Sequence, residues 1–208
     1  MIIDYYYSVL SDWAYLGGEA FERLALRYEA TVRHKPICLS DVYARTGGIL
    51  LQKRSQQRQD YRVTELVRWS KHLGIPVELF PQHYPTSDRV ASCMIVAAAE
   101  TGESPGKLSN CILRAIWAEN RNISDPETLV EIARGIGLDG QALLARAQRP
   151  ETANSWAANT DEAIAAGVFG SPFYLCEGHL FWGQDRLPFL EDVLKGDVAP
   201  LAAAPSEM

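Results

Sequence analysis

Segments with strand character occur only near the two ends of this chain. Residues 2–7 are rich in β-branched and aromatic side chains and predict a strand, and residues 31–37 predict a second strand; residues 12–28 between them carry leucines and alanines near helical spacing. This order predicts a β-α-β unit, in which two strands of one sheet are joined by a helix.

The C-terminal strand segments form a second unit. Residues 171–175 and 179–182 flank the short turn Cys-Glu-Gly and predict a β-hairpin. A helix is predicted on either side of this hairpin, at residues 152–166 and at residues 186–194. The second unit is therefore α-β-β-α.

A long stretch of helical pattern separates the two units. From Val63 onward, apolar residues recur at helical spacing. Residues 124–137 show this most clearly, because Ser124 or Asp125 can cap a helix that has proline in its first turn and glycine near its end. Residues 45–59 contain two glycines and no period, and predict a loop.

The element order predicts an α/β fold, namely a thioredoxin-like domain interrupted by an all-helical insertion. Residues 1–45 and 152–198 would form the thioredoxin-like domain, and residues 46–151 the insertion. Residues 199–208, rich in alanine and proline, would be a loose tail. With 208 residues, of which 47% are hydrophobic, the chain can bury one sizeable core.

The charge and the terminal sequence exclude several classes of partner. The net charge is −6, whereas a nucleic-acid or anionic-membrane partner requires a basic face. No apolar run approaches the roughly 20 residues of a membrane-spanning helix. The N-terminus lacks the basic start and small-residue cleavage site of a signal peptide, so we expect a cytoplasmic protein.

The four cysteines are far apart in the sequence and have no metal-ligand spacing, and the same holds for the four histidines. We therefore expect no metal, and we expect the cysteines to be free thiols. These residues are Cys38, Cys93, Cys111 and Cys176, and His34, His72, His83 and His179.

Ser11 stands at the turn between the first predicted strand and the first predicted helix. A serine in this place can be an N-cap that accepts a hydrogen bond from a free backbone N–H group. It can also act with those N–H groups to stabilise a bound anion, such as a thiolate. The local sequence leaves both roles open.

Three separated segments carry a resemblance to a known family. They are LSDWAYLG at residues 10–17, RQDYRVTELVRWSKHLGIPV at residues 58–77, and GVFGSPFYL with FWGQDRL within residues 167–187. In this order they resemble the 2-hydroxychromene-2-carboxylate isomerases and the kappa-class glutathione transferases, a branch of the DsbA-like thioredoxin superfamily. The resemblance covers nearly the whole chain, and it implies glutathione as cofactor, a small aromatic substrate and a homodimer.

The resemblance implies a catalytic role for Ser11. Redox members of the superfamily have a cysteine at this position, whereas here the sulfur would be brought by glutathione and its thiolate would accept a hydrogen bond from Ser11. A thiol pKa of about 8.5 would have to fall by roughly two units, equivalent to about 2.7 kcal/mol, to make the thiolate dominant at neutral pH. Asp12 stands where the family mostly has proline, and its like charge would raise that pKa.

The C-terminal motif supplies the other implied glutathione contacts. Ser171-Pro172 resembles the cis-proline loop of thioredoxin-like proteins, which implies that the backbone of Ser171 pairs with the cysteinyl backbone. Gln184 and Asp185 would hold the γ-glutamyl end, with Asp185 binding its ammonium. Alternatively, Asp185 only caps the last helix.

The remaining candidates are basic and aromatic. Arg58 falls near the family's basic residue that meets the glycyl carboxylate, and Lys53 is its rival. Trp13, Tyr84 and Trp182 could form an aromatic wall for a flat substrate, although such residues also serve in cores.

These features predict a glutathione-dependent isomerase of 2-hydroxychromene-2-carboxylate-type intermediates of aromatic degradation, acting through transient addition of the thiolate. One alternative is a kappa-type transferase, which releases the conjugate as product. Another is a non-catalytic protein that binds glutathione or a peptide. A disulfide oxidoreductase is disfavoured because its two active-site sulfurs are missing.

Overall fold

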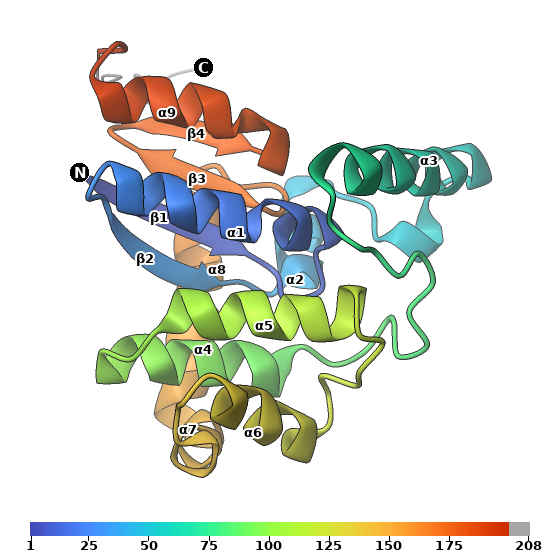
Figure 1. The fold of residues 1–208 in the computed structure, drawn as a ribbon, viewed down its shortest axis with the longest axis vertical. Coiled ribbons are helices and arrows are strands. Elements are labelled where there is room, and N and C mark those ends of the chain that lie inside the picture. Colours follow the sequence, from blue (N-terminus) through green and yellow to red (C-terminus); the bar gives the residue numbers. More distant parts are fainter. Residues whose placement is uncertain (200–208) are drawn as a thin grey trace.

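The computed structural model describes residues 1–199 and contains a four-stranded sheet with the strand order β2-β1-β3-β4 (Figure 1). Strand β1 pairs in parallel with β2 and antiparallel with β3, and β3 pairs antiparallel with β4. The strands are β1 (Ile2–Tyr7), β2 (Thr31–Pro36), β3 (Phe173–Cys176) and β4 (His179–Trp182).

Helices make up most of the rest of the described chain. None of the helices within residues 1–199 is long and apolar enough to cross a membrane. In chain order they are α1 (Asp12–Arg27), α2 (Leu39–Thr46), the 3-10 helix η1 (Leu51–Lys53), α3 (Gln56–Leu73), α4 (Arg89–Thr101), α5 (Pro105–Trp117), α6 (Pro126–Gly135), α7 (Gly140–Ala147), α8 (Pro150–Ala165), the 3-10 helix η2 (Gln184–Arg186) and α9 (Leu187–Lys195).

The predicted β-α-β unit, the C-terminal hairpin and the helices on either side of the hairpin are confirmed. Asp125, rather than Ser124, caps α6, because its carboxylate accepts a hydrogen bond from the Thr128 N–H at 3.0 Å. The tail predicted at residues 199–208 lies, except for Ala199, outside the described residues.

The loop predicted at residues 45–59 is wrong at both ends. Helix α2 continues to Thr46 and ends at Gly47, whose φ of 81° glycine adopts without strain. Helix α3 begins at Gln56, earlier than its apolar period indicates, since the first turn of α3 contains only glutamine and arginine side chains. Only the middle of the predicted loop is irregular, and it includes η1.

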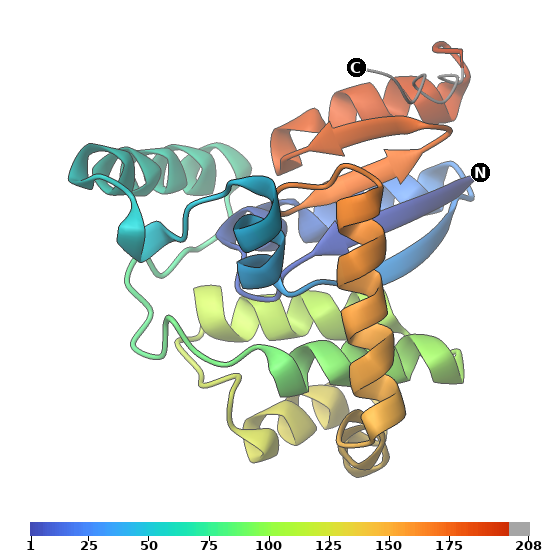
Figure 2. The same cartoon turned by 180° about the vertical axis from the view of Figure 1, so that it is seen from behind.

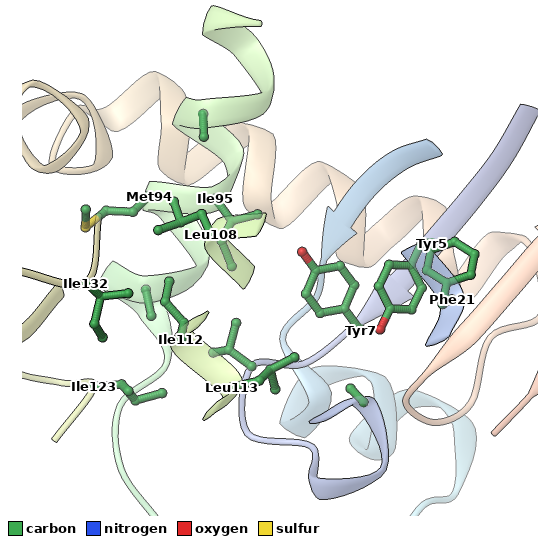
Figure 3. Packing of buried hydrophobic residues seen from close by; sticks show 14 of the residues in the cluster. Tyr5, Tyr7, Phe21, Met94, Ile95, Leu108, Ile112, Leu113, Ile123 and Ile132 are labelled. Carbon is green, nitrogen blue, oxygen red and sulfur yellow. The ribbon is translucent and has the colours of Figure 1, made fainter. Parts of the chain in front are cut away.

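The three consecutive tyrosines of β1 are divided between the two faces of the sheet, because successive strand residues point to opposite sides. On one face Tyr5 stacks between Tyr7 and Tyr174, with ring centroids 4.3 and 5.1 Å apart. Phe21 of α1 packs on the same cluster (Figure 3). Tyr6 points to the other face, into a second apolar cluster beneath α8, which crosses that face (Figure 2).

The helical segment shares its core with the sheet. Met94 and Ile95 of α4 pack with Leu108 and Ile112 of α5 (Figure 3), and these residues belong to the same apolar cluster as Tyr5. The α/β architecture with helices inserted between the second and third strands is therefore as predicted. The domain boundaries expected at residues 45/46 and 151/152 stay a prediction.

Candidate active site at the N-terminus of helix α1

Ser11 is the N-cap of α1, at the end of the turn that follows β1. The Ser11 N–H donates to the Ser8 carbonyl at 3.0 Å, which closes the turn. The Ser11 Oγ accepts a hydrogen bond from the Ala14 N–H at 3.1 Å. Ser11 is only 6% exposed, so its hydroxyl lies at the positive end of the helix with little competing water.

The cis-proline loop lies directly beside this helix start. The Ser171–Pro172 peptide bond is cis, as predicted. The Ser11 hydroxyl donates to the Ser171 carbonyl at 3.2 Å, and the Ser8 N–H donates to the Ser171 Oγ at 2.9 Å. In the described part of the chain the Ser171 N–H forms no hydrogen bond. Ser11 therefore caps the helix as an acceptor and gives its hydroxyl proton to the cis-proline loop.

Asp12 in the first turn of α1 forms an ion pair with Arg62 of α3. Both side chains are nearly buried, with exposed fractions of 8% and 13%. The Arg62 guanidinium also lies over the ring of Trp117, 5.4 Å from its centroid. Burial raises the pKa of Asp12, and Arg62 opposes that rise. The sequence predicts that the Asp12 carboxylate repels a nearby thiolate. The ion pair with Arg62 compensates the carboxylate charge and so weakens this repulsion.

Two cavities meet at Ser171 and Trp13, which line both of them. The smaller cavity, of about 270 Å³, contains the predicted residues Gln184, Asp185 and Trp182. Gln184 is buried against Gly17 of α1. A Cβ atom added at Gly17 would lie only 2.5 Å from the Cβ of Gln184. Neither η2 nor α9 has a side-chain cap, so the alternative role of Asp185 as a helix cap does not apply.

The larger cavity, of about 370 Å³, contains Ser11 and the predicted wall residue Tyr84. The Tyr84 ring packs on Trp117, with centroids 5.0 Å apart. Burial, and next the charge of Asp12, raise the pKa of the Tyr84 hydroxyl, which therefore stays protonated at neutral pH. Of the predicted wall residues, Trp182 lines the smaller cavity, Tyr84 lines the larger one, and Trp13 lines both.

The basic residues of the larger cavity are not the ones that the resemblance implies. Arg58 and Lys53 are exposed and line neither cavity. Arg54 and Arg62 line the larger cavity instead. The Nε of Arg54 donates a hydrogen bond to the Ile49 carbonyl at 2.8 Å, which holds the guanidinium in place. Because α3 begins at Gln56, both arginines lie on this helix, with Arg62 about one turn after Arg58.

Two further observations concern the cysteines and possible metal ligands. All four cysteines are free thiols, none lines either cavity, and burial raises the pKa of each. Within residues 1–199 no group of three or more histidine, cysteine or acidic residues could hold a metal ion. The polar groups that line the two cavities are hydroxyls, guanidinium groups, carboxyls, side-chain amides and backbone groups.

Comparison with known proteins agrees with this architecture. A 2-hydroxychromene-2-carboxylate isomerase of Pseudomonas putida is 29% identical over 196 residues, which cover 93% of this chain and 94% of that protein. Glutathione S-transferase kappa 1 of Homo sapiens is 24% identical, with coverage of 92% and 90%. A solved structure of a 2-hydroxychromene-2-carboxylate isomerase is 26% identical and has a TM-score of 0.81, with coverage of 94% and 95%.

The relatives named above are isomerases and a glutathione transferase, and they match this chain almost from end to end. A family model described as a DSBA-like thioredoxin domain matches residues 2–195. Because that match includes all four strands and the helices between them, the chain belongs to the DSBA-like thioredoxin domain family.

Proposed function

We propose that this protein is a glutathione-dependent isomerase of 2-hydroxychromene-2-carboxylate-type intermediates of aromatic degradation. The observation that carries the proposal is Ser11, a hydroxyl in place of a redox sulfur at the start of α1, hydrogen-bonded to the loop of cis-Pro172. The names of the relatives support the reaction type. We place the reaction in the cytoplasm and expect a homodimer.

The residues present fit glutathione, an extended tripeptide with a charged group at each end. Gln184 and Asp185 in the smaller cavity suit the γ-glutamyl end, which carries both a carboxylate and an ammonium. The free N–H of Ser171 suits the cysteinyl backbone, midway between the cavities. Arg54, rather than Arg58 or Lys53, suits the glycyl carboxylate, because its guanidinium lines the larger cavity.

Bound glutathione supplies a thiolate that adds reversibly to an electron-poor carbon of the substrate, so that a double bond becomes a single bond that can rotate. Ser11 stabilises the charged sulfur by donating its O–H, and the N-terminus of α1 adds a favourable dipole. Tyr84, held against Trp117, gives the larger cavity a flat apolar side for an aromatic ring.

The choice of Arg54 predicts a difference between two neighbouring arginines. Arg54→Ala should weaken glutathione binding roughly tenfold, since it removes a charge-assisted hydrogen bond. The matched variant Arg58→Ala removes an exposed guanidinium that lines neither cavity and should leave the affinity unchanged. Calorimetric titration with glutathione measures both. If only Arg58→Ala lost affinity, Arg58 would hold the carboxylate, as the family resemblance implies.

An assay with glutathione in substoichiometric amount tests the proposed reaction. On a panel of chromene carboxylates, we expect many turnovers per glutathione, with the same amount of free glutathione before and after the reaction. A kappa-type transferase is the second candidate, because kappa-class relatives match the chain over nearly its whole length. That candidate predicts loss of one glutathione per turnover into a thioether. Binding of glutathione without either reaction would overturn both enzyme assignments.

A further inference from the structure

Asp88 lines the same cavity as Ser11 and takes no part in the chemistry described so far. It occupies the N-cap position of α4, where an aspartate side chain usually accepts a hydrogen bond from the first helical turn. Here the Asp88 carboxyl forms no such cap, and no ion pair within residues 1–199 includes it. The half-buried carboxyl is therefore left to face the cavity.

The surroundings of Asp88 favour its protonated form. Burial raises the pKa of its carboxyl to about 6, its own backbone N–H opposes the rise, and the nearby carboxylate of Asp41 on α2 adds to it. Of the cationic groups that line the cavity, Arg62 is already paired with Asp12, while Arg54 is held by the Ile49 carbonyl. Any anion bound in the cavity would raise the pKa of Asp88 further.

We propose that Asp88 is the general acid of the isomerisation, giving a proton to the substrate oxygen that gains negative charge when the thiolate adds. The inference rests on the proposed function and names a residue for it. A carboxyl whose pKa is raised toward neutral pH is suited to donating and recovering a proton within one turnover.

The proton transfer balances within a single turnover. In the ring-opened substrate, the double bond that must rotate is conjugated to a carbonyl group. As the nucleophile adds to the far carbon, the electron pair of the carbonyl takes the Asp88 proton, so that the Asp88 O–H bond breaks and an enol O–H bond forms. After rotation the enol returns this proton to the Asp88 carboxylate, both double bonds form again, and the nucleophile leaves with its own electron pair. No oxidant or additional reactant is needed.

Kinetics of three carboxyl variants test the role of Asp88. Asp88→Asn should lower turnover roughly a hundredfold, as expected for loss of a general acid, without changing the affinity for glutathione. It should also abolish the fall in turnover at high pH that the wild type shows as Asp88 ionises. The matched variant Asp41→Asn should keep the maximal turnover but move that fall to lower pH, because Asp41 raises the pKa of Asp88. Asp88→Glu, which retains a carboxylic acid, should recover part of the rate.

A second measurement does not depend on activity. The ¹³C signal of the Asp88 carboxyl, titrated with and without the unreactive probe chroman-2-carboxylate, should give a higher pKa when the probe is bound. An unchanged Asp88 titration with the probe bound, or wild-type turnover in Asp88→Asn, would overturn the inference and leave the proposed function standing. A wild-type protein that binds glutathione but isomerises no chromene carboxylate would overturn the proposed function and this inference together.

Discussion

Replacing Ser11 by alanine should lower turnover roughly a hundredfold, because it removes the hydroxyl that donates to the glutathione thiolate. The same change should raise the pKa of bound glutathione, since the hydrogen bond favours the charged sulfur. Affinity should fall less than turnover, because the other ends of the tripeptide keep their contacts. Ultraviolet titration of the thiolate, together with steady-state kinetics, measures all three quantities.

Ligand binding also requires the Ser11 hydroxyl to change partner. Without ligand it donates to the Ser171 carbonyl, and turning toward the sulfur would free this carbonyl to accept from a ligand N–H group. The matched variant Ser8→Ala removes a hydroxyl of the same turn, which accepts from the Leu10 N–H, and should retain the thiolate. Equal thiol titration curves in Ser11→Ala and the wild type would mean that Ser11 acts only as the cap of α1.

Replacing Trp117 by alanine should lower the free energy of unfolding by about 3–5 kcal/mol, the usual range for a large aromatic side chain removed from a core. Trp117 is fully buried at the end of α5, and its ring supports both Tyr84 and the Arg62 guanidinium. The variant should therefore also lose affinity for an aromatic ligand in the larger cavity. Urea unfolding and a binding titration with chroman-2-carboxylate measure the two effects.

Two further variants show whether packing is the cause. Trp117→Phe keeps an aromatic face under Arg62 and removes an indole N–H that has no hydrogen-bond partner among the described residues, so it should lose much less stability. Trp182→Ala removes a ring that is 52% exposed and should also have a smaller effect. A Trp117→Ala variant as stable as Trp182→Ala would contradict the burial of Trp117.

The parts of the fold and site that the sequence predicts depend on short-range patterns. The β-branched and aromatic composition of β1, the cap at Ser11 and the hairpin at β3–β4 each involve neighbouring residues, so their physical causes can be read from the local sequence. The cis bond before Pro172 came from the family resemblance, because only about one X-Pro bond in twenty is cis in folded proteins.

The parts that the sequence does not predict depend on contacts between distant segments. Arg62 meets Asp12 across 50 positions, and Asp88 joins the cavity from the start of a different helix. Arg58 and Arg62 lie four positions apart on α3. Their sequence spacing does not show which of the two lines the cavity. Only the three-dimensional arrangement shows which guanidinium faces the site.

The Asp12–Arg62 pair constrains the order in which these positions can diverge. Loss of either partner leaves the other charge nearly buried and uncompensated, typically at a cost of about 3–5 kcal/mol, but Arg62 alone keeps its contact with the face of the Trp117 ring. Arg62 alone is the less costly intermediate, so a lineage with an uncharged residue at position 12 would have acquired the arginine first and the aspartate second. Once Asp12 is present, loss of the arginine at position 62 leaves the Asp12 carboxylate buried without a cation. The residue at the start of α1 therefore restricts which substitutions α3 can accept at position 62.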